Sequence, residues 1–354
     1  MSAHESRSSA GPRRRVLVTG ATGYVGRHVV PHVFEQGFAV RALVRGGSNR
    51  SAVAEYTEDF HEGDVTDAAS LAGACEGCCG VVHLVGVINE KQGSFDAIHI
   101  QGTRNVVAEA QRAGCEVFVY LSGLGARVDP NAGRYHQTKD AAERIVAESG
   151  MRAYNFPASV IFGPEDEFLN LFVGMARSML NPPWPIMPAI AGGHSYLQPV
   201  WVEDVAEVLA RALREDFPFP PASYELGGPQ PLKVREIERI ACRCARASRI
   251  LVPIPMWKAK IIAFFMETFM SKPLLTLDQL KMLQEDGRCK MNMTEKILGR
   301  PARSLWDYAC EQFGLGERRA VAVGAATYTD VVRPQERILW RPEPPKEEKA
   351  ARKP

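Results

Sequence analysis

The sequence predicts an α/β fold with a doubly wound parallel sheet and a smaller, mixed C-terminal region. Between residues 15 and 165, short β-like runs alternate with helical patterns, and the runs are almost continuously apolar. Strands that are buried on both faces of a parallel sheet have this composition, whereas half-exposed strands alternate apolar and polar residues. Because a strand, a helix and a second strand in succession form a βαβ unit, the repeated alternation predicts parallel strands with helices on both faces.

The elements of this sheet region follow one another along the chain. We expect strands at residues 16–18, 39–44, 81–85, 117–121 and 160–162. Apolar residues recur at helical spacing between them, near residues 25–36, 67–76, 95–113 and 135–149. A connection that contains a helix is what joins parallel strands, so these segments fit the predicted sheet.

Beyond residue 165 the sequence changes in character. Proline-rich segments at 181–185 and 217–221 break regular structure, and helical patterns recur near residues 203–214, 234–247, 257–270 and 276–285. We therefore divide the chain into four parts, namely a disordered leader at 1–14, a sheet domain at 15–165, a region at 166–315 that completes the fold, and an extended tail at 316–354.

For 257–270, whose apolar residues cover a wide arc of a helix, a core helix is the favoured interpretation and docking to a membrane or a membrane-bound partner is the alternative.

Composition excludes several classes of protein. The 43 basic and 41 acidic residues give a net charge of +2, so there is no electrostatic argument for nucleic-acid binding. No apolar run reaches the roughly 18 residues that a membrane-spanning helix needs. Eight cysteines do not make a disulfide scaffold in a chain of this length, and we expect Cys75, Cys78 and Cys79 to be thiols at a helix end, with no metal site. A reducing compartment, the cytoplasm, is the simplest interpretation.

A glycine-rich loop follows the first expected strand and opens the first expected helix. Its sequence is Gly20-Ala21-Thr22-Gly23-Tyr24-Val25-Gly26. Gly20 permits a tight turn out of the strand, Gly23 lets the backbone approach a pyrophosphate, and Gly26 lets the helix pack closely on the sheet. Free N–H groups at the start of the helix then face the phosphates. The loop therefore predicts that residues 15–165 form an NAD(P)-binding Rossmann domain.

The residue after the second strand bears on the choice of dinucleotide. Arg45 stands near the position where an acidic residue would bind a ribose hydroxyl, and arginine there suits the 2′-phosphate of NADP(H), so NAD(H) is the less favoured cofactor. Ser48 and Arg50 could assist, Asp64 could accept a hydrogen bond from adenine, and Asp67 is expected to cap a helix. The predicted cofactor-binding residues are Gly20, Thr22, Gly23, Tyr24, Val25, Gly26, Arg45, Asp64, Val65, Leu84, Val85, Gly86 and Lys139.

A tyrosine and a lysine four residues apart predict proton-transfer chemistry. Tyr135 and Lys139 share one face of the helix expected at 135–149. A nearby ammonium group stabilises a phenolate and is expected to lower the pKa of Tyr135. Ser122 follows the strand at 117–121, on the same edge of the sheet as the glycine loop. We therefore predict Ser122, Tyr135 and Lys139 as catalytic residues, with Ser122 orienting a substrate carbonyl.

Taken together, these residues resemble the short-chain dehydrogenase/reductase superfamily in its extended or atypical branch. Four later segments, at 159–170, 198–206, 224–229 and 275–280, narrow the resemblance to the group that includes the Rossmann-type accessory subunit of respiratory complex I and its bacterial relatives. The resemblance covers about residues 14–315 and implies NADP(H) binding with links to quinone or respiratory-chain function. The chain departs from it at Pro157-Ala158, where relatives commonly carry Arg-Pro, and at His99, where extended enzymes often carry asparagine.

Three functions fit these patterns. The first is an NADP(H)-dependent oxidoreductase acting on a carbonyl or quinone-related substrate, and the second is a non-catalytic accessory or assembly subunit of a respiratory or ubiquinone-biosynthesis complex. The third is a sugar-nucleotide epimerase or dehydratase. We expect a cytoplasmic protein, or one peripheral to the inner membrane, on the matrix face of mitochondria if the host is eukaryotic. Residues 257–270 are the candidate contact with a membrane or a respiratory complex.

Overall fold

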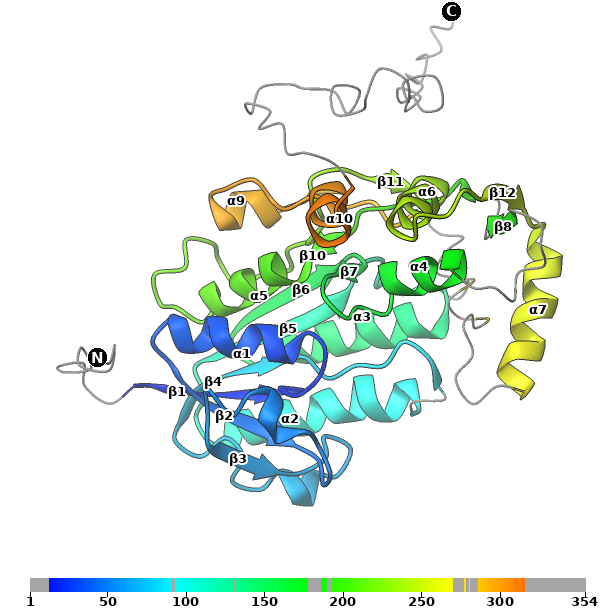
Figure 1. Cartoon of the computed structure of the whole chain (residues 1–354). Coiled ribbons are helices and arrows are strands. Elements are labelled where there is room, and N and C mark those ends of the chain that lie inside the picture. Colours follow the sequence, from blue (N-terminus) through cyan, green and yellow to red (C-terminus); the bar gives the residue numbers. More distant parts are fainter. Residues whose placement is uncertain are drawn as a thin grey trace, which may run out of the picture.

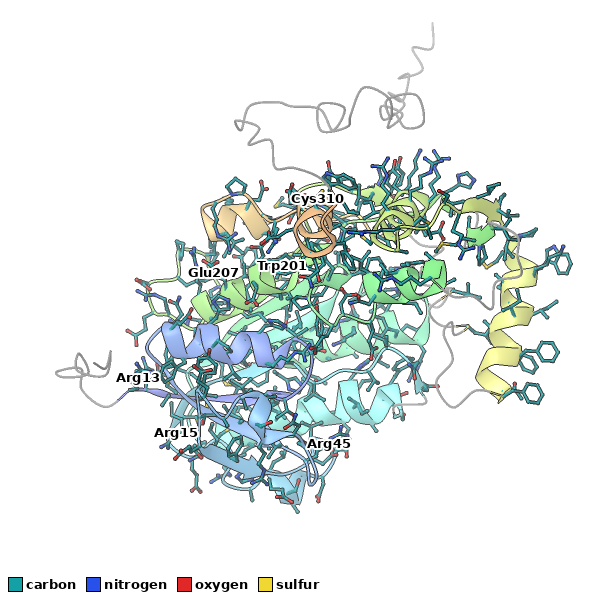
Figure 2. The ribbon with its side chains drawn as sticks, viewed as in Figure 1. Arg13, Arg15, Arg45, Trp201, Glu207 and Cys310 are labelled. Atoms are coloured by element: carbon teal, nitrogen blue, oxygen red, sulfur yellow. The ribbon has the colours of Figure 1, made fainter. Side chains whose placement is uncertain are left out.

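A six-stranded parallel sheet in the order β3-β2-β1-β4-β5-β6 forms the centre of the fold (Figure 1). The computed structural model describes residues 13–90, 93–129, 132–177, 186–189, 193–269, 277, 280 and 286–315. The strands are β1 (Arg15–Thr19), β2 (Ala39–Val44), β3 (Asp59–Glu62), β4 (Cys78–His83), β5 (Val117–Gly123) and β6 (Arg152–Ala158). Arg15, at the start of β1, and Arg45, just after β2, lie at opposite ends of the sheet (Figure 2). The predicted doubly wound α/β fold is confirmed.

Three strands differ from the prediction. The segment expected at 160–162 is the short strand β7 (Ile161–Phe162), which pairs outside the main sheet with β10 (Val200–Trp201). The sixth strand of the sheet is β6, whose apolar run is interrupted by Asn155 and Pro157. The edge strand β3 was not expected either, because its sequence Asp-Phe-His-Glu is mostly polar. Both strands are specified by pairing with a neighbour rather than by an apolar run.

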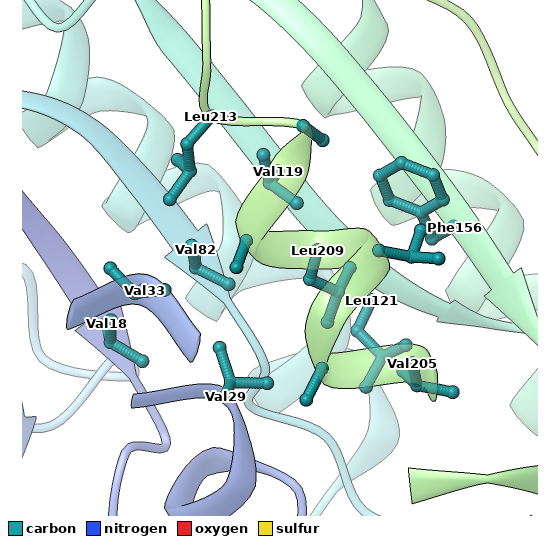
Figure 3. Packing of buried hydrophobic residues seen from close by; sticks show 14 of the residues in the cluster. Val18, Val29, Val33, Val82, Val119, Leu121, Phe156, Val205, Leu209 and Leu213 are labelled. Atoms are coloured by element: carbon teal, nitrogen blue, oxygen red, sulfur yellow. The ribbon is translucent and has the colours of Figure 1, made fainter. Parts of the chain in front are cut away.

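Helices cover both faces of the sheet. α1 (Gly26–Glu35) and α5 (Val202–Arg211) pack on one face, and α2 (Thr103–Arg112) and α3 (Arg134–Ala147) pack on the other. Figure 3 shows the first contact, in which Val29 of α1 and Leu209 of α5 meet Val82 and Val119 of the sheet. The alternate residues of β5, Phe118 and Tyr120, belong to the apolar cluster on the α2 and α3 side. Each face of the central strands is therefore buried, as their apolar composition predicted.

Two segments predicted as α-helices contain other kinds of turn, and two cysteines lie on a strand instead of at a helix end. The segment expected at 67–76 contains only the 3₁₀ turn η2 (Ala68–Leu71), which Asp67 caps as predicted by accepting from Ala69 N at 3.0 Å. The helix expected at 95–113 begins as a π-helical turn, η4 (Asp96–Gly102), and continues as α2. The placement of Cys78 and Cys79 at a helix end is wrong, because both begin β4.

The C-terminal region packs around a second apolar cluster. The region contains α4 (Leu169–Arg177), β8 (Ile186–Ala189), β9 (Tyr196–Leu197), β11 (Leu232–Lys233), α6 (Val234–Cys244), β12 (Ile250–Pro253), α7 (Met256–Phe269), α9 (Thr294–Leu298) and α10 (Leu305–Phe313). Of these, α9 packs in the first cluster, through Ile297 and Leu298. The helices expected near 203–214, 234–247 and 257–270 correspond to α5, α6 and α7. Most of the helix expected at 276–285 lies outside the described residues, as do the tail at 316–354 and all but two residues of the leader at 1–14.

Helix α7 is not the core helix that was favoured from its sequence. Of its described side chains, Ala259 and Ala263 are the ones buried in the second cluster, and most of the large apolar ones are exposed. Among the described residues, no helix has the length and apolar content that a membrane crossing requires.

A glutamate joins the two helices that cover the first face of the sheet. The N–H groups of His28 and His32, on α1, donate to the two carboxylate oxygens of Glu203, on α5, at 2.6 and 3.0 Å. Burial alone would raise the pKa of Glu203, but the two histidines lower it to about 2. Burial alone would lower the pKa of His32, but Glu203 raises it above its ordinary value. The charged pair of Glu203 and His32 therefore stabilises the contact between α1 and α5.

We predict that Glu203→Gln lowers the free energy of unfolding by about 1 kcal/mol, a size suited to a half-exposed pair that water screens. The loss should be largest between pH 4.5 and 6.5, the ordinary pKa values of the two groups. It should shrink as the pH falls toward 2, where Glu203 is protonated, and as the pH rises through the raised pKa of His32. Urea unfolding across this range measures it, with Glu35→Gln as the control because Glu35 lies farther from His32, at 3.5 Å, and its side chain is more exposed. A loss that is independent of pH would contradict the prediction.

Candidate functional site

A cavity of about 1120 Å³ opens at the carboxyl ends of the parallel strands. In open α/β sheets, ligands bind at this edge, near the place where the strand order reverses, which here lies between β1 and β4. All of the cofactor-binding and catalytic residues predicted from the sequence line this one cavity. The structure therefore brings the predicted residues together, and their individual roles stay predictions.

The glycine loop forms the turn between β1 and α1. Gly20 has a φ of +70°, a conformation that favours glycine, and its carbonyl accepts a hydrogen bond from Gly23 N at 3.0 Å. A Cβ at position 26 would overlap the carbonyl oxygens of Gly20 and Ala21, so α1 can begin this close to β1 only with glycine there. A Cβ at Gly23 would meet only the carbonyl oxygen of Gly20, at 3.2 Å, and would otherwise point into open space. The loop thus leaves room for a pyrophosphate beside the start of a helix.

Arg45 and Asp64 border the cavity at the ends of neighbouring strands. The side chain of Arg45 is exposed and makes no hydrogen bond or ion pair with the described residues, while its backbone N–H donates to Ser48 Oγ at 3.1 Å. Burial alone would raise the pKa of Asp64, but hydrogen bonds from Thr66 and the charge of Arg45 lower it. Arg50 does not line the cavity; its guanidinium is paired with Glu62 at 2.7 Å. Arg45 is therefore the cation available to an anionic ligand here.

Lys139 lies beside the end of β5 and is buried. Its Nζ donates to the hydroxyl of Tyr120 and to the carbonyl oxygen of Leu121, both at 3.2 Å. Burial lowers the pKa of Lys139 to about 8, against the opposing charge of Glu143. Tyr120 is a contact that the sequence reasoning missed, although it lies two residues before Ser122 on the same face of β5. The lysine is thus fixed by the strand rather than by the neighbouring tyrosine on its own helix.

The pKa of Tyr135 moves in the opposite direction from the prediction. Burial, with the charge of Glu143, raises it to about 12, and Tyr135 makes no hydrogen bond to Lys139 among the described residues. The expected stabilisation of phenolate by the ammonium group is therefore wrong for this arrangement, because desolvation dominates. At neutral pH the hydroxyl of Tyr135 keeps its proton.

Gly123, rather than Ser122, meets the hydroxyl of Tyr135. A Cβ at position 123 would overlap Tyr135 Oη, so the absence of a side chain makes room for the phenol. Ser122 lines the cavity, and its buried Oγ has no hydrogen-bond partner among the described residues. No hydrogen bond joins Ser122 to Tyr135 in the part of the chain that the structure describes. The sequence position alone could not distinguish the two residues, since adjacent side chains on a strand point to opposite faces.

His99 packs against Tyr135, a role that the sequence reasoning did not assign. Val87 N donates to His99 Nε2 at 3.1 Å, so the ring proton resides on Nδ1 and is directed at Thr138 Oγ1, 3.0 Å away. Burial lowers the pKa of His99 to about 3, which keeps the ring neutral. Its ring meets that of Tyr135 edge-on, with 5.7 Å between the centroids. His99 lies in the π-helical turn η4, and such turns often occur at functional sites.

The C-terminal region adds an apolar wall to the same cavity. The apolar lining residues from β7, α4, β9 and the segments next to them are Val160, Ile161, Phe168, Leu171, Phe172 and Leu197, and Glu167 and Asp286 also line the cavity. The sequence predicts a strand at 160–162, and 159–170 is part of the resemblance, but neither pattern assigns these residues to a ligand cavity. The spacing of apolar residues within 168–176 is the signal that could have indicated the apolar wall. That spacing does not distinguish a core helix from a cavity wall, however. The space beside Tyr135 therefore suits an apolar ligand.

Comparison with known proteins supports the resemblance. A family model described as the NAD dependent epimerase/dehydratase family matches residues 16–227. A mitochondrial protein of Arabidopsis thaliana, NADH dehydrogenase [ubiquinone] 1 alpha subcomplex subunit 9, is 29% identical over 334 residues, which cover 86% of this chain and 82% of the relative. The ceramide reductase of Caulobacter vibrioides is 32% identical over 205 residues, which cover 56% of this chain and 61% of that enzyme.

A solved structure has a similar fold. The NADPH-dependent quinone oxidoreductase of Escherichia coli, in complex with NADPH, matches with a TM-score of 0.65 at 18% identity. The match covers 84% of this chain and 99% of that chain. At that identity the likeness concerns the fold alone, and it agrees with the parallel sheet and its flanking helices.

We predict that alanine at two positions of the glycine loop has different consequences. Gly26→Ala should lower the free energy of unfolding by about 2 kcal/mol or more, because its Cβ overlaps backbone atoms that cannot move aside. Gly23→Ala should change stability by less than about 1 kcal/mol yet weaken NADPH binding at least roughly tenfold, because the new methyl group enters the pyrophosphate space. Urea unfolding without nucleotide and titration calorimetry measure the two effects. Unchanged NADPH affinity in Gly23→Ala would show that this loop does not hold the phosphates.

Proposed function

The chain belongs to the NAD dependent epimerase/dehydratase family, and from that membership we propose that it is an NADP(H)-dependent oxidoreductase. Its substrate would be an apolar carbonyl compound or a quinone-related compound. The observation that carries the proposal is one cavity that combines the glycine loop, a buried tyrosine and lysine, and an apolar wall. Ceramide reductase and a putative dihydroflavonol 4-reductase among the relatives are consistent with a reductase.

The residues of the cavity fit a dinucleotide. The loop at 20–26 would hold the pyrophosphate, and the unpaired side chain of Arg45 would bind a 2′-phosphate, so NADP(H) is proposed over NAD(H). Lys139 Nζ lies 3.0 Å from the position that a Cβ would take at Gly86, in the segment that follows β4. Lys139 would therefore contact the cofactor as well as the strand. When bound, the nicotinamide supplies or accepts the hydride.

Tyr135 would supply the proton. Its hydroxyl is protonated at neutral pH because burial raises its pKa to about 12. A protonated phenol can donate to the oxygen of a carbonyl group as that oxygen gains negative charge, so hydride plus this proton converts the carbonyl to an alcohol. Reduction is therefore the proposed direction near neutral pH. His99 and Gly123 would position the side chain of Tyr135. His99 packs on the Tyr135 ring, and Gly123 leaves space for the Tyr135 hydroxyl.

A non-catalytic accessory subunit is the second candidate function. It is favoured by the Arabidopsis relative, a NADH dehydrogenase subunit that the match covers over most of its length. Among the described residues, no hydrogen bond joins Ser122 to Tyr135, which also fits a chain without turnover. In that case a bound nucleotide would stabilise the fold by mass action without turnover. The chain would then sit with a respiratory complex at the inner membrane. A sugar-nucleotide epimerase is less favoured because the cavity wall is apolar.

We predict that Tyr135→Phe lowers the rate of NADPH oxidation with its best quinone or apolar ketone by about 10²- to 10⁴-fold and leaves NADPH affinity within about threefold. The phenyl ring fills the same space but has no proton to donate. Tyr56→Phe is the control, since Tyr56 lies outside the cavity and packs on Phe34. Stopped-flow assays against a substrate panel provide the measurement. Turnover that is the same in Tyr135→Phe and the unaltered chain would end this assignment, and a chain inactive with every substrate would favour the accessory subunit.

We predict that Arg45→Ala weakens NADPH binding roughly tenfold or more and leaves NADH binding unchanged. A charge-assisted contact with phosphate contributes about 1.5 to 3 kcal/mol. Arg50→Ala, which removes a nearby arginine already paired with Glu62, should change neither affinity by more than about twofold. Calorimetric titration of all three chains with both nucleotides tests this. Tighter binding of NADH than of NADPH by the unaltered chain would overturn the assignment of NADP(H).

A further inference from the structure

Helix α7 places its small side chains inside the molecule and its large apolar side chains outside. Ala259 and Ala263 are buried against the second apolar cluster. Trp257, Phe264 and Phe269 are 62%, 56% and 78% exposed. A surface helix ordinarily has the reverse arrangement, with its large apolar residues facing the core. This inversion leaves an apolar surface that the fold itself does not use.

The outer surface of α7 combines apolar and cationic residues. Its exposed large apolar residues are Trp257, Ile261, Ile262, Phe264, Phe265 and Phe269. At 100° per residue, Ile261 lies opposite the two buried alanines, and Lys258 and Lys260 lie on either side of it. Both lysines are exposed, and Lys258 Nζ lies 5.3 Å from the centre of the Trp257 ring. Lysines beside aromatic residues are typical of helices that lie in a membrane interface.

The neighbouring strands extend this surface. β12, which precedes α7, exposes Ile250 and Val252, and its partner β8 exposes Ile186. Figure 1 shows α7 at the outer edge of the molecule, next to β8 and β12, and Figure 2 shows ring side chains on α7 that point away from the body. A fluid hydrocarbon phase needs no complementary shape, and anionic headgroups match the lysines.

We propose that α7, together with the exposed residues of β12, binds the surface of an anionic phospholipid bilayer, with the helix lying in the plane of the membrane. The buried side of α7 packs in the cluster that contains Phe172, which also lines the cavity. An apolar substrate dissolved in the bilayer would then meet the protein close to its site. The proposal concerns attachment and does not depend on the proposed reaction.

Vesicle binding by the full chain tests the proposal. The protein should sediment with vesicles of phosphatidylcholine mixed with phosphatidylglycerol, less with phosphatidylcholine alone, and less as salt is added. The fluorescence of the unaltered chain should shift to the blue on mixing with these vesicles, and Trp257→Phe should remove most of the shift. Absence of sedimentation with either vesicle would overturn the proposal.

Paired variants locate the contact on α7. Phe264→Ser with Phe265→Ser should lower the partition coefficient at least about tenfold, because two large apolar groups no longer enter the bilayer. Lys258→Glu with Lys260→Glu should reduce binding to mixed vesicles to the level seen with phosphatidylcholine alone. Met291→Ser, which alters an equally exposed apolar residue outside α7, should leave the partition coefficient unchanged. Matching urea midpoints would establish that the variants are folded.

Two results would contradict the assignment. Equal vesicle binding by the phenylalanine pair and the unaltered chain would place the contact elsewhere. Self-association in sedimentation velocity that requires Phe264 and Phe265, without vesicle binding, would make this face a contact between copies. Turnover of a water-soluble quinone in the absence of vesicles is measured separately, so failure of the proposed reaction and failure of membrane binding can be distinguished.

Discussion

The close approach of helix α1 to the end of β1 is the constraint on which the site depends. The backbone carbonyls of Gly20 and Ala21 occupy the space where a side chain at Gly26 would begin. Because no side chain is there, the first turn of α1 faces the cavity, and the rest of the helix reaches α5 through His28, His32 and Glu203. One missing Cβ therefore fixes both the phosphate-sized space and the packing of one face of the sheet.

Burial has a consistent effect on the titratable groups around the cavity. It raises the pKa of Tyr135 to about 12 and lowers those of Lys139 and His99 to about 8 and 3. Each shift favours the neutral form, as desolvation requires. The phenol keeps its proton and the imidazole stays uncharged. The charge in this part of the site would thus come mainly from the lysine and from whatever nucleotide is bound.

Features that depend on local spacing could be predicted from the sequence, and features that depend on packing could not. The glycine loop and the Tyr135–Lys139 pair are each encoded within a few residues, Arg45 stands at a set distance after the loop, and all of them line one cavity. The approach of the Tyr135 hydroxyl to Gly123 depends on how α3 packs at the end of β5, which no local pattern states. β6 was missed because Asn155 and Pro157 interrupt its apolar run, although β5 pairs with it. Similarly, the outward face of α7 could not be distinguished from a core helix by composition, because its buried side consists of alanines.

The strand order has a consequence for how such a chain can diversify. The half of the sheet formed by β1, β2 and β3 carries the glycine loop and Arg45, while the apolar wall comes from segments that follow β6. The glycine loop and Arg45 come from different segments than that wall. Insertions or replacements after β6 can therefore reshape the apolar part of the cavity and leave the half formed by β1, β2 and β3 intact. The same fold can therefore acquire new ligand specificities when the segments after β6 change and the parallel sheet does not.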